Sequence, residues 1–228
     1  MADYKKPDYW QQKARKEGYP ARSVYKLKEI DEKFGLLKPR RAVLRALDLG
    51  AAPGSWSLYV LRKTASVFLA AADLSPLSRE FDKGLFDGDN FFFIQGDIAA
   101  AEVSKALVSK GPYQAIISDA APGTTGNHTV DAARSLELAA AVIAYTQSAL
   151  ADGGNLALKV FQGGESGALL KQLKTLFETA KSFKPQACRG ESVETYFIGL
   201  GKKHFALSGV PTSISRFPAT TIPLSAGF

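Results

Sequence analysis

The sequence predicts an α/β fold with a mostly parallel sheet that ends in an antiparallel pair of strands. Two observations lead to this prediction. From residue 42 onward, short apolar runs alternate with longer amphipathic stretches, which is the pattern of successive βαβ units. Towards the C-terminal end, two strand-like runs are separated only by a short turn region, too short for a helical crossover, so they should pair antiparallel.

The predicted strands are short runs rich in apolar residues. In chain order they are residues 42–49, 67–74, 91–95, 114–119, 154–160, 181–188 and 194–201. Most of these runs are continuously apolar rather than alternating, which indicates that both faces of the sheet are covered. The amphipathic stretches between them predict helices over residues 55–63, 99–110, 131–151 and 166–177.

The first 41 residues predict a basic helical segment in front of the sheet. One helical face is marked by apolar residues at Val24, Leu27, Ile30, Phe34 and Leu37. Ser23 is the expected N-cap, and Gly35 and Pro39 should end the helix. We therefore divide the chain into an N-terminal helical segment (1–41), a main domain (42–203) and a C-terminal tail (204–228), which carries one charge and three prolines.

The positive charge of the chain is concentrated at its start. The net charge is +7, and residues 1–41 hold 12 Lys or Arg against 6 Asp or Glu, whereas the remainder holds 17 against 16. Phosphate backbones are the commonest target of such a patch, although a solvated helix face has the same composition. Four residues are the candidates for phosphate contacts with RNA: Arg15, Lys16, Arg22 and Lys28.

The composition also narrows the class of protein. The single cysteine, Cys188, excludes an internal disulfide and a cysteine-based zinc cluster. The chain starts without a charged and apolar leader pattern, and none of its apolar runs is long enough to span a bilayer. We expect a cytoplasmic monomer that has no metal centre and does not bind a membrane.

The stretch LDLGAAPGSW, residues 47–56, follows the first predicted strand of the sheet and opens a helix. Gly50 and Gly54 allow a tight turn and a close approach of the backbone to a ligand. The loop has neither the glycine spacing of a dinucleotide fingerprint nor the lysine of a P-loop. A loop of this kind can also exist only to pack a helix against a strand.

Two acidic residues at the ends of the next strands point to a nucleoside. Asp73 is placed to accept both ribose hydroxyls, and Asp97 to bond an adenine amino group, although each can also serve as a helix N-cap. Together with the glycine loop they indicate adenosine without a pyrophosphate, which suggests S-adenosylmethionine. Trp56 is then a candidate cation–π partner of the sulfonium, or simply a core residue.

Four charged residues lie at places where charges are unusual. Asp119 ends the fourth strand, Lys159 ends the fifth, Glu194 lies on the last, and Lys26 is on the early basic helix. Ordinary salt bridges under a loop would need the same residue types. Charges at the ends of buried strands are, however, typical of functional sites.

Five stretches together resemble the FtsJ-type RNA ribose 2′-O-methyltransferases, whose architecture is a class I methyltransferase fold. They are YPARSVYKLKEIDEKFGLLKP, LDLGAAPGSWS, IISDAAPGTTGNHTVDAARSLELA, LALKVFQGGE and SVETYFIGLG, which span about residues 19–203. The resemblance implies a catalytic tetrad of Lys26, Asp119, Lys159 and Glu194. It implies contacts with S-adenosylmethionine at Gly50, Ala51, Pro53, Gly54, Trp56, Asp73, Asp97 and Asp119, and product S-adenosylhomocysteine without a metal.

The chain length is similar to that of the bacterial members that methylate a uridine of large-subunit ribosomal RNA. Transfer RNA, an mRNA cap and a non-catalytic RNA-binding role remain alternatives. Carbon-5 cytosine methylation needs a cysteine nucleophile, and Cys188, predicted on a late strand, is badly placed for it. An NAD-dependent enzyme is disfavoured by the spacing of the glycine loop and by the terminal antiparallel pair.

The chemistry of ribose methylation assigns a hypothetical role to each tetrad residue. Lys159 either removes the proton of the 2′-hydroxyl as a neutral amine, or orients the oxygen as a charged ammonium. Lys26 would position the substrate, while Asp119 and Glu194 would hold the two lysines. Tyr196 is a candidate for packing on the target nucleotide.

Overall fold

The computed structural model describes residues 9–163, 165–188 and 192–204, and its centre is a seven-stranded sheet in the order β3-β2-β1-β4-β5-β7-β6. The strands are β1 (Leu44–Leu49), β2 (Val67–Asp73), β3 (Phe91–Gln95), β4 (Tyr113–Ser118), β5 (Leu150–Phe161), β6 (Phe177–Phe183) and β7 (Glu194–Lys202). The helices are α1 (Tyr9–Lys16), α2 (Val24–Phe34), α3 (Ser55–Lys63), α4 (Ala101–Ser109), α5 (His128–Ala149) and α6 (Ser166–Leu176), with a 3₁₀ turn η1 (Leu85–Asp87).

The pairing of the strands confirms the predicted fold class. Strands β1 to β5 pair in parallel, and β7 runs antiparallel to both β5 and β6. The bounds of one strand were predicted wrongly. We placed it at residues 181–188, but β6 starts at Phe177, directly after α6, and residues 184–188 form a turn region.

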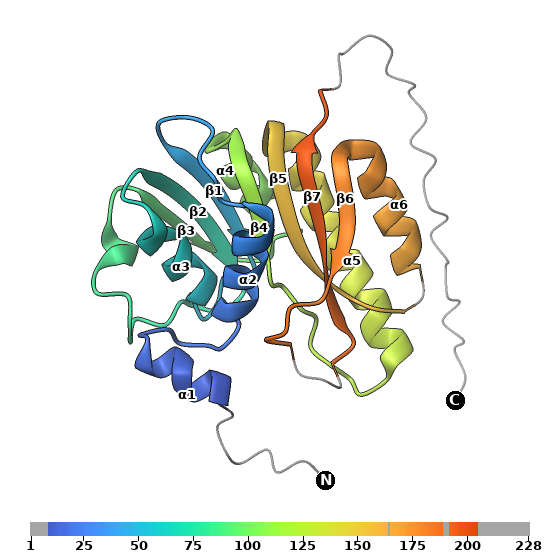
Figure 1. Ribbon diagram of the computed structural model, residues 1–228, viewed down its shortest axis with the longest axis horizontal. Helices are drawn as coiled ribbons and strands as arrows, with labels where there is room; N and C mark the ends of the chain where they lie inside the picture. The colour runs from blue at the N-terminus through green and yellow to red at the C-terminus, as the bar shows by residue number, and fades with distance from the viewer. Residues whose placement is uncertain (1–8, 164, 189–191, 205–228) are drawn as a thin grey trace, which may run out of the picture.

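Helices cover both faces of the sheet, which explains why its strands are continuously apolar (Figure 1). Helices α2 and α3 pack on the face that is turned towards the viewer in Figure 1, and α4, α5 and α6 pack on the other. Leu27 and Ile30 of α2 belong to the same buried cluster as Leu58 of α3 and Ile117 of β4. The N-terminal segment is therefore packed on the sheet through its apolar stripe.

Helix α2 ends where the sequence predicts and starts by a different device. Gly35 adopts φ +62° and its N–H donates to Asp31 O, a left-handed C-cap that glycine accommodates without strain. Ser23 occupies the N-cap position, but its side chain makes no capping hydrogen bond. Its carbonyl instead accepts the indole N–H of Trp56 at 2.8 Å, which ties α2 to α3.

Within the described ranges, none of the helices is both long enough and apolar enough to cross a membrane. Except for His204, the predicted tail 204–228 lies outside the described residues, as do residues 1–8.

Candidate active site

The loop after β1 is a tight backbone turn built around Gly50. Its N–H and that of Ala51 both donate to Ala72 O on β2, at 2.9 and 3.1 Å. Gly50 has φ +79°, and a Cβ added there would lie 2.6 Å from the Cα of Ala120. Only glycine fits this position without moving the backbone, so the loop is pressed closely against the segment that follows β4.

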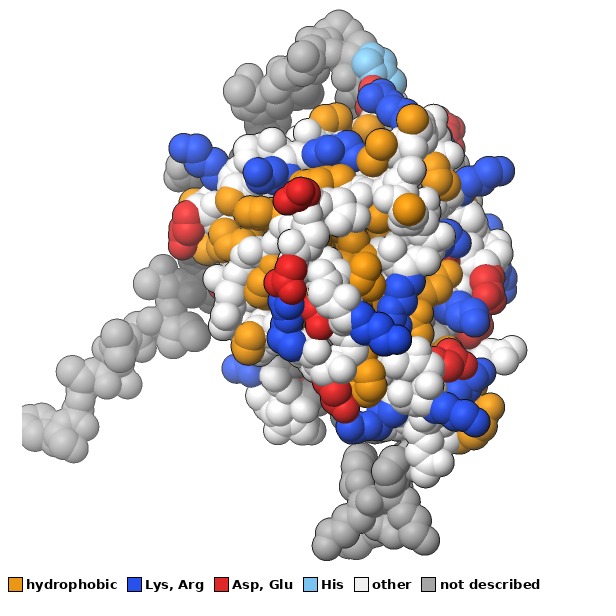
Figure 2. All heavy atoms as spheres, turned by 90° about the vertical axis from the view of Figure 1, so that its left-hand side faces the viewer, with side chains coloured by type: hydrophobic (Ala, Val, Ile, Leu, Met, Phe, Trp, Pro, Cys, Tyr) orange, Lys and Arg blue, Asp and Glu red, His pale blue; other side chains and the backbone are white. Residues whose placement is uncertain are grey.

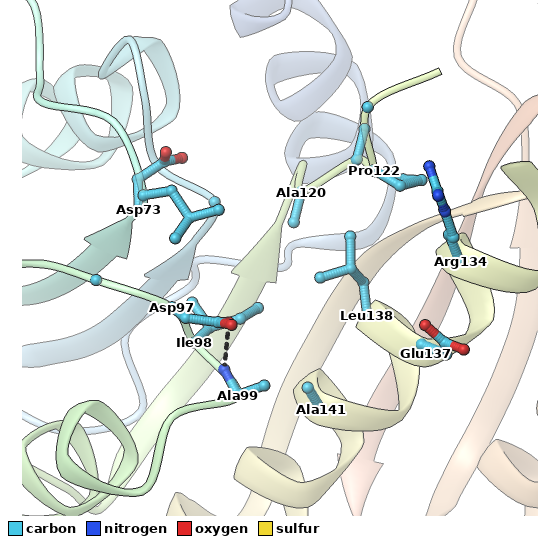
Figure 3. A pocket seen from close by; sticks show the side chains of 15 residues that line it. Asp73, Asp97, Ile98, Ala99, Ala120, Pro122, Arg134, Glu137, Leu138 and Ala141 are labelled. Atoms are coloured by element: carbon cyan, nitrogen blue, oxygen red, sulfur yellow. Dashed lines mark hydrogen bonds between the residues drawn. The ribbon is translucent and has the colours of Figure 1, made fainter. Parts of the chain in front are cut away.

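A cavity of about 470 Å³ opens beside this loop, at the carboxyl ends of the strands. Figure 3 shows Asp73 and Asp97 on one side of it and Arg134 and Glu137 of α5 on the other. Its walls are formed by Gly50, Asp73, Leu74, Gly96, Asp97, Ile98, Ala99, Ala120, Ala121, Pro122, Gly123, Arg134, Glu137, Leu138 and Ala141. Leu74 is 70% exposed, an apolar surface that a bound ring would cover.

The two acidic residues of the cavity are held by backbone amides. Asp73 accepts the N–H of Ala52 at 2.9 Å and that of Ser75 at 2.8 Å. Asp97 accepts the N–H of Ala99 at 2.8 Å. Each carboxylate keeps free lone pairs for a ligand, since two oxygens offer about four acceptor sites. Gly50, Asp73 and Asp97 are therefore brought together as the sequence indicates.

The other residues that the resemblance assigns to the cofactor do not line this cavity. Ala51 is buried within the loop, and a Cβ on Gly54 would lie 2.9 Å from the ring of Phe86, so Gly54 serves the packing of the loop against η1. Pro53 is exposed. Trp56 is only 2% exposed and packs in the core.

Sequence reasoning missed Asp48, which lies on β1 directly in front of the loop. The residue is 0% exposed; its Oδ2 accepts the hydroxyl of Ser57 at 2.7 Å, and its Oδ1 has no hydrogen-bond partner. Burial raises the pKa of Asp48 to about 7 against the opposing effect of the Ser57 hydrogen bond, and the charges of Asp119 and Asp73 raise it further. An acid inside an otherwise apolar strand was the available signal.

The four residues of the implied tetrad form two ion pairs. Lys159 Nζ lies 3.0 Å from Asp119 Oδ1 and also donates to the main-chain oxygen of Asp119. Lys26 Nζ lies 2.7 Å from Glu194 Oε1. All four side chains are at least four-fifths buried. The structure thus brings α2, β5, β7 and the end of β4 to one place.

Tyr196 joins the two ion pairs. Its hydroxyl donates to Asp119 Oδ1 at 2.5 Å, and Lys26 Nζ lies 5.9 Å from the centre of its ring. Burial, followed by the charges of Asp119 and Glu194, raises the pKa of Tyr196 above its ordinary value, so the phenol stays protonated and donates. Tyr196 is 0% exposed. The prediction that it packs on the target nucleotide is wrong, because both its faces are covered by the protein.

Asp119 is the anionic centre of this cluster. Its burial alone would raise the pKa, but the charges of Lys159 and Lys26 and the hydrogen bonds from Tyr196 and Lys159 together lower the pKa of Asp119 below its ordinary value. The carboxylate is therefore ionised at neutral pH and holds Lys159 in a fixed position.

Cys188 lies in the turn region after β6, not on a strand as we predicted. Burial, followed by the charge of Glu194 and a hydrogen bond to it, raises the pKa of Cys188 to about 12. A thiol with such a pKa is not a nucleophile at neutral pH. The exclusion of cysteine-dependent methylation stays a prediction.

The four basic candidates for RNA contact have different surroundings. Arg15 pairs with Glu80 at 2.7 Å, and Arg22 donates to the carbonyl of Ala187 at 2.6 Å. Lys16 and Lys28 are exposed.

Among the described residues, no group of three or more His, Cys, Asp or Glu side chains is arranged to hold a metal ion.

A strand order with β7 antiparallel between β5 and β6, and a glycine loop beside two acids, define the fold of class I S-adenosylmethionine-dependent methyltransferases. The family model of FtsJ-like methyltransferases matches residues 19–202, and the chain belongs to this family.

Relatives and solved structures agree with this assignment. The ribosomal RNA large subunit methyltransferase E of Treponema denticola is 49% identical over 203 residues, which are 88% of this chain and 97% of that protein. The protein of that name from Oleidesulfovibrio alaskensis is 46% identical over 86% of this chain and 92% of its own length. A crystal structure described as a putative ribosomal RNA methyltransferase from Plasmodium falciparum has a TM-score of 0.67 at 26% identity, covering 81% of this chain and 98% of that one.

Proposed function

We propose that the protein transfers a methyl group from S-adenosylmethionine to a ribose 2′-hydroxyl of large-subunit ribosomal RNA. One observation carries the proposal: two buried lysine–acid pairs, Lys159–Asp119 and Lys26–Glu194, meet at Tyr196 beside a cavity framed by a glycine loop. The relatives that are 41–49% identical bear the name of ribosomal RNA large subunit methyltransferase E, which supports this substrate.

The residues around the cavity fit S-adenosylmethionine. Asp73 and Asp97 keep acceptors for the ribose and adenine, and Leu74 offers an apolar wall. A charge argument supports the methionine end, because Asp73 and Asp119 both lie close enough to Asp48 to raise its pKa, and two such neighbouring acids suit a cationic ligand. When bound, this cofactor supplies an electrophilic methyl on a sulfonium and leaves as neutral S-adenosylhomocysteine.

Lys159 is proposed to act on the reacting oxygen. Two of its three N–H directions are occupied by the carboxylate and the carbonyl of Asp119, which leaves one direction for the ribose hydroxyl. The ammonium form of Lys159 would orient the oxygen for attack and stabilise its developing negative charge, while the hydroxyl proton leaves to water. Asp119, held by Tyr196, is a positioning residue for Lys159.

Lys26 is proposed to contact the substrate from the side of α2. Its ion pair with Glu194 is about nine-tenths buried, so its ammonium is held in place before RNA arrives. A fixed positive charge beside the reacting ribose suits the neighbouring phosphate. Glu194 is the positioning residue in this pair.

The test is the substitution Lys159→Ala in the full chain. We expect transfer of labelled methyl to large-subunit RNA to fall at least about 100-fold, while S-adenosylmethionine affinity, measured by calorimetry, stays within about threefold because Lys159 does not line the cofactor cavity. The exposed Lys171 of α6 provides the matched control, Lys171→Ala, which should behave like wild type. Wild-type turnover in Lys159→Ala would overturn the assignment.

The target is proposed to be a uridine in the large ribosomal subunit, methylated in the cytoplasm by a monomer. Labelled methyl should enter assembled large subunits or their RNA and not transfer RNA or capped mRNA. Mapping the modified ribose then identifies the base, and labelling of transfer RNA alone would refute this substrate.

A further inference from the structure

A second cavity, of about 610 Å³, lies at the end of α2 that is remote from Lys26. Its walls are formed by Phe34, Gly35, Lys38, Pro39, Arg40, Asn155 and Leu200. Lys26 is in the first turn of α2 and Phe34 is its last residue, so they lie about 12 Å apart along the helix axis. The two cavities share no lining residue.

Buried amide side chains hold the backbone around this cavity. Asn155, 5% exposed, donates to the carbonyl of Leu36 at 3.1 Å. Gln114, 8% exposed, accepts the N–H of Arg40 at 3.0 Å and donates to the carbonyl of Val43 at 2.7 Å. Satisfied polar groups of this kind specify one backbone path. The segment between α2 and β1 therefore has a defined shape.

The lining of the cavity is basic and aromatic. Lys38 and Arg40 are exposed, neither forms an ion pair within the described part of the chain, and the described lining contains no acidic side chain. Two of the three acids of α2 are occupied elsewhere: Glu29 accepts the N–H of Gln186 and Asp31 pairs with Lys63, while Glu32 is exposed.

A pair of aromatic rings extends the same surface towards the tetrad. Phe34 and Phe183 meet edge to face at 5.2 Å. Lys33 Nζ lies 4.3 Å from the centre of the Phe183 ring, and Lys181 Nζ lies 5.7 Å from that of Phe34. Phe183 of β6 is the register partner of Tyr196 on β7, beside the ion pairs. Cations and rings thus lead from the site to the second cavity.

The surface at the β3 edge of the sheet differs in its charges from the surface along α2. Figure 2 shows acidic and basic side chains intermixed on this face. Arg79 there pairs with Asp82 and Asp87, and Arg15 pairs with Glu80. Cations that are neutralised in this way attract phosphates weakly. The surface along α2 is the better candidate for an extended anionic partner.

We propose that the α2–β6 surface, formed by Lys33, Phe34, Lys38, Arg40, Lys181 and Phe183, binds the substrate RNA a few nucleotides away from the reacting ribose. An unpaired nucleotide occupies the second cavity, with its base against Phe34 and its phosphates beside Lys38 and Arg40. Positive grooves with aromatic platforms are the usual means of binding single strands. The inference rests on the proposed function only in taking RNA as the substrate.

The test uses a charge-reversed double variant, Lys38→Glu with Arg40→Glu, and a matched control, Lys171→Glu with Lys174→Glu. The control changes the same charge at exposed residues of α6, on the opposite face of the sheet. Affinity for a labelled fragment of large-subunit RNA is measured by anisotropy at several salt concentrations, with S-adenosylhomocysteine present. We expect binding at least about tenfold weaker and a log–log salt slope less steep by about 1.4 in the α2–β6 variant alone.

Turnover supplies a second measurement. In the α2–β6 double variant, KM for the RNA should rise, whereas kcat should stay within about twofold of the wild-type value, because the variant leaves the tetrad intact. Phe34→Leu keeps an apolar side chain and should weaken RNA binding about fivefold or more through lost stacking, with thermal unfolding checked for both variants.

The proposal would be overturned if the two double variants weakened RNA binding equally, or if the α2–β6 variant bound RNA as tightly as the wild type. Unchanged RNA affinity is the result expected if the surface instead binds an acidic protein. The binding measurement does not need turnover. A wild-type protein that binds RNA through this surface without methylating it would therefore refute the proposed function alone.

Discussion

Asp48 allows a prediction whose magnitude follows from the structure. Its carboxyl is fully buried on β1, accepts a hydrogen bond from Ser57 and leaves Oδ1 without a partner. Burial, against the hydrogen bond from Ser57, raises the pKa of Asp48 to about 7, with the charges of Asp119 and Asp73 adding to the effect. The substitution Asp48→Asn removes the titrating group and keeps its shape.

The direction in which stability changes with pH follows from the pKa of Asp48 in the unfolded and in the folded protein. The unfolded chain ionises this residue near pH 3.9, whereas the folded protein keeps it neutral up to about pH 7. The stability that a neutral Asp48 contributes is therefore complete below about pH 4 and is lost as the pH rises to 7, by about 1.4 kcal/mol for each unit. Between pH 5 and pH 8 the wild type should lose about 2–3 kcal/mol through this residue, and Asp48→Asn should not.

Urea unfolding of both proteins at pH 5 and pH 8 measures this difference. The buried amide of asparagine changes the free energy of unfolding by itself, but by the same amount at both pH values. The informative quantity is therefore how much the difference in free energy of unfolding between Asp48→Asn and wild type changes from pH 5 to pH 8. Asp89→Asn is the control, because Asp89 is exposed and has no ion pair among the described residues. Its free energy of unfolding should differ from that of the wild type by the same amount at pH 5 and pH 8. If the free energies of unfolding of Asp48→Asn and wild type differ equally at pH 5 and pH 8, the reasoning is refuted.

Two further substitutions test the site. Tyr196→Phe removes the hydroxyl that donates to Asp119 at 2.5 Å; we expect about 1–2 kcal/mol less stability in urea and about tenfold slower methyl transfer, and an unchanged kcat would show that Lys159 alone positions Asp119. Gly50→Ala puts a Cβ 2.6 Å from Ala120 at φ +79°; S-adenosylmethionine affinity by calorimetry should fall at least about tenfold, and Gly167→Ala, which meets open space, should keep it.

Much of the fold could be predicted because its strands are buried on both faces. An apolar run such as residues 114–119 has few alternatives to a central strand, and β4 occupies Tyr113–Ser118. The boundaries after long helices were harder. Strand β5 starts at Leu150, directly after α5, although residues 151–154 look like a turn. It does so through a register shift opposite β4 between Tyr113 and Ala115, which local sequence does not show.

The positions of candidate site residues could be predicted where they lie at the ends of strands. They were harder to predict where the orientation of a side chain decides whether it faces the site or the core. Asp119 and Lys159 end neighbouring parallel strands, so their pairing follows from the topology. The orientation of Trp56 and Tyr196 does not, because an aromatic residue near a site can face a ligand or the core. Both face the core, with ring centres 5.9 Å apart.

The position of Tyr196 explains why the two ion pairs can act as one unit. Because β7 is inserted antiparallel between β5 and β6, its first residues lie beside the last residues of β5, and Tyr196 pairs with Lys159 in register. The same short segment therefore supplies Glu194 for Lys26 and the phenol for Asp119. A wholly parallel sheet would bring the start of its last strand to the opposite edge. The antiparallel strand is thus the feature that allows both lysine–acid pairs to be held side by side.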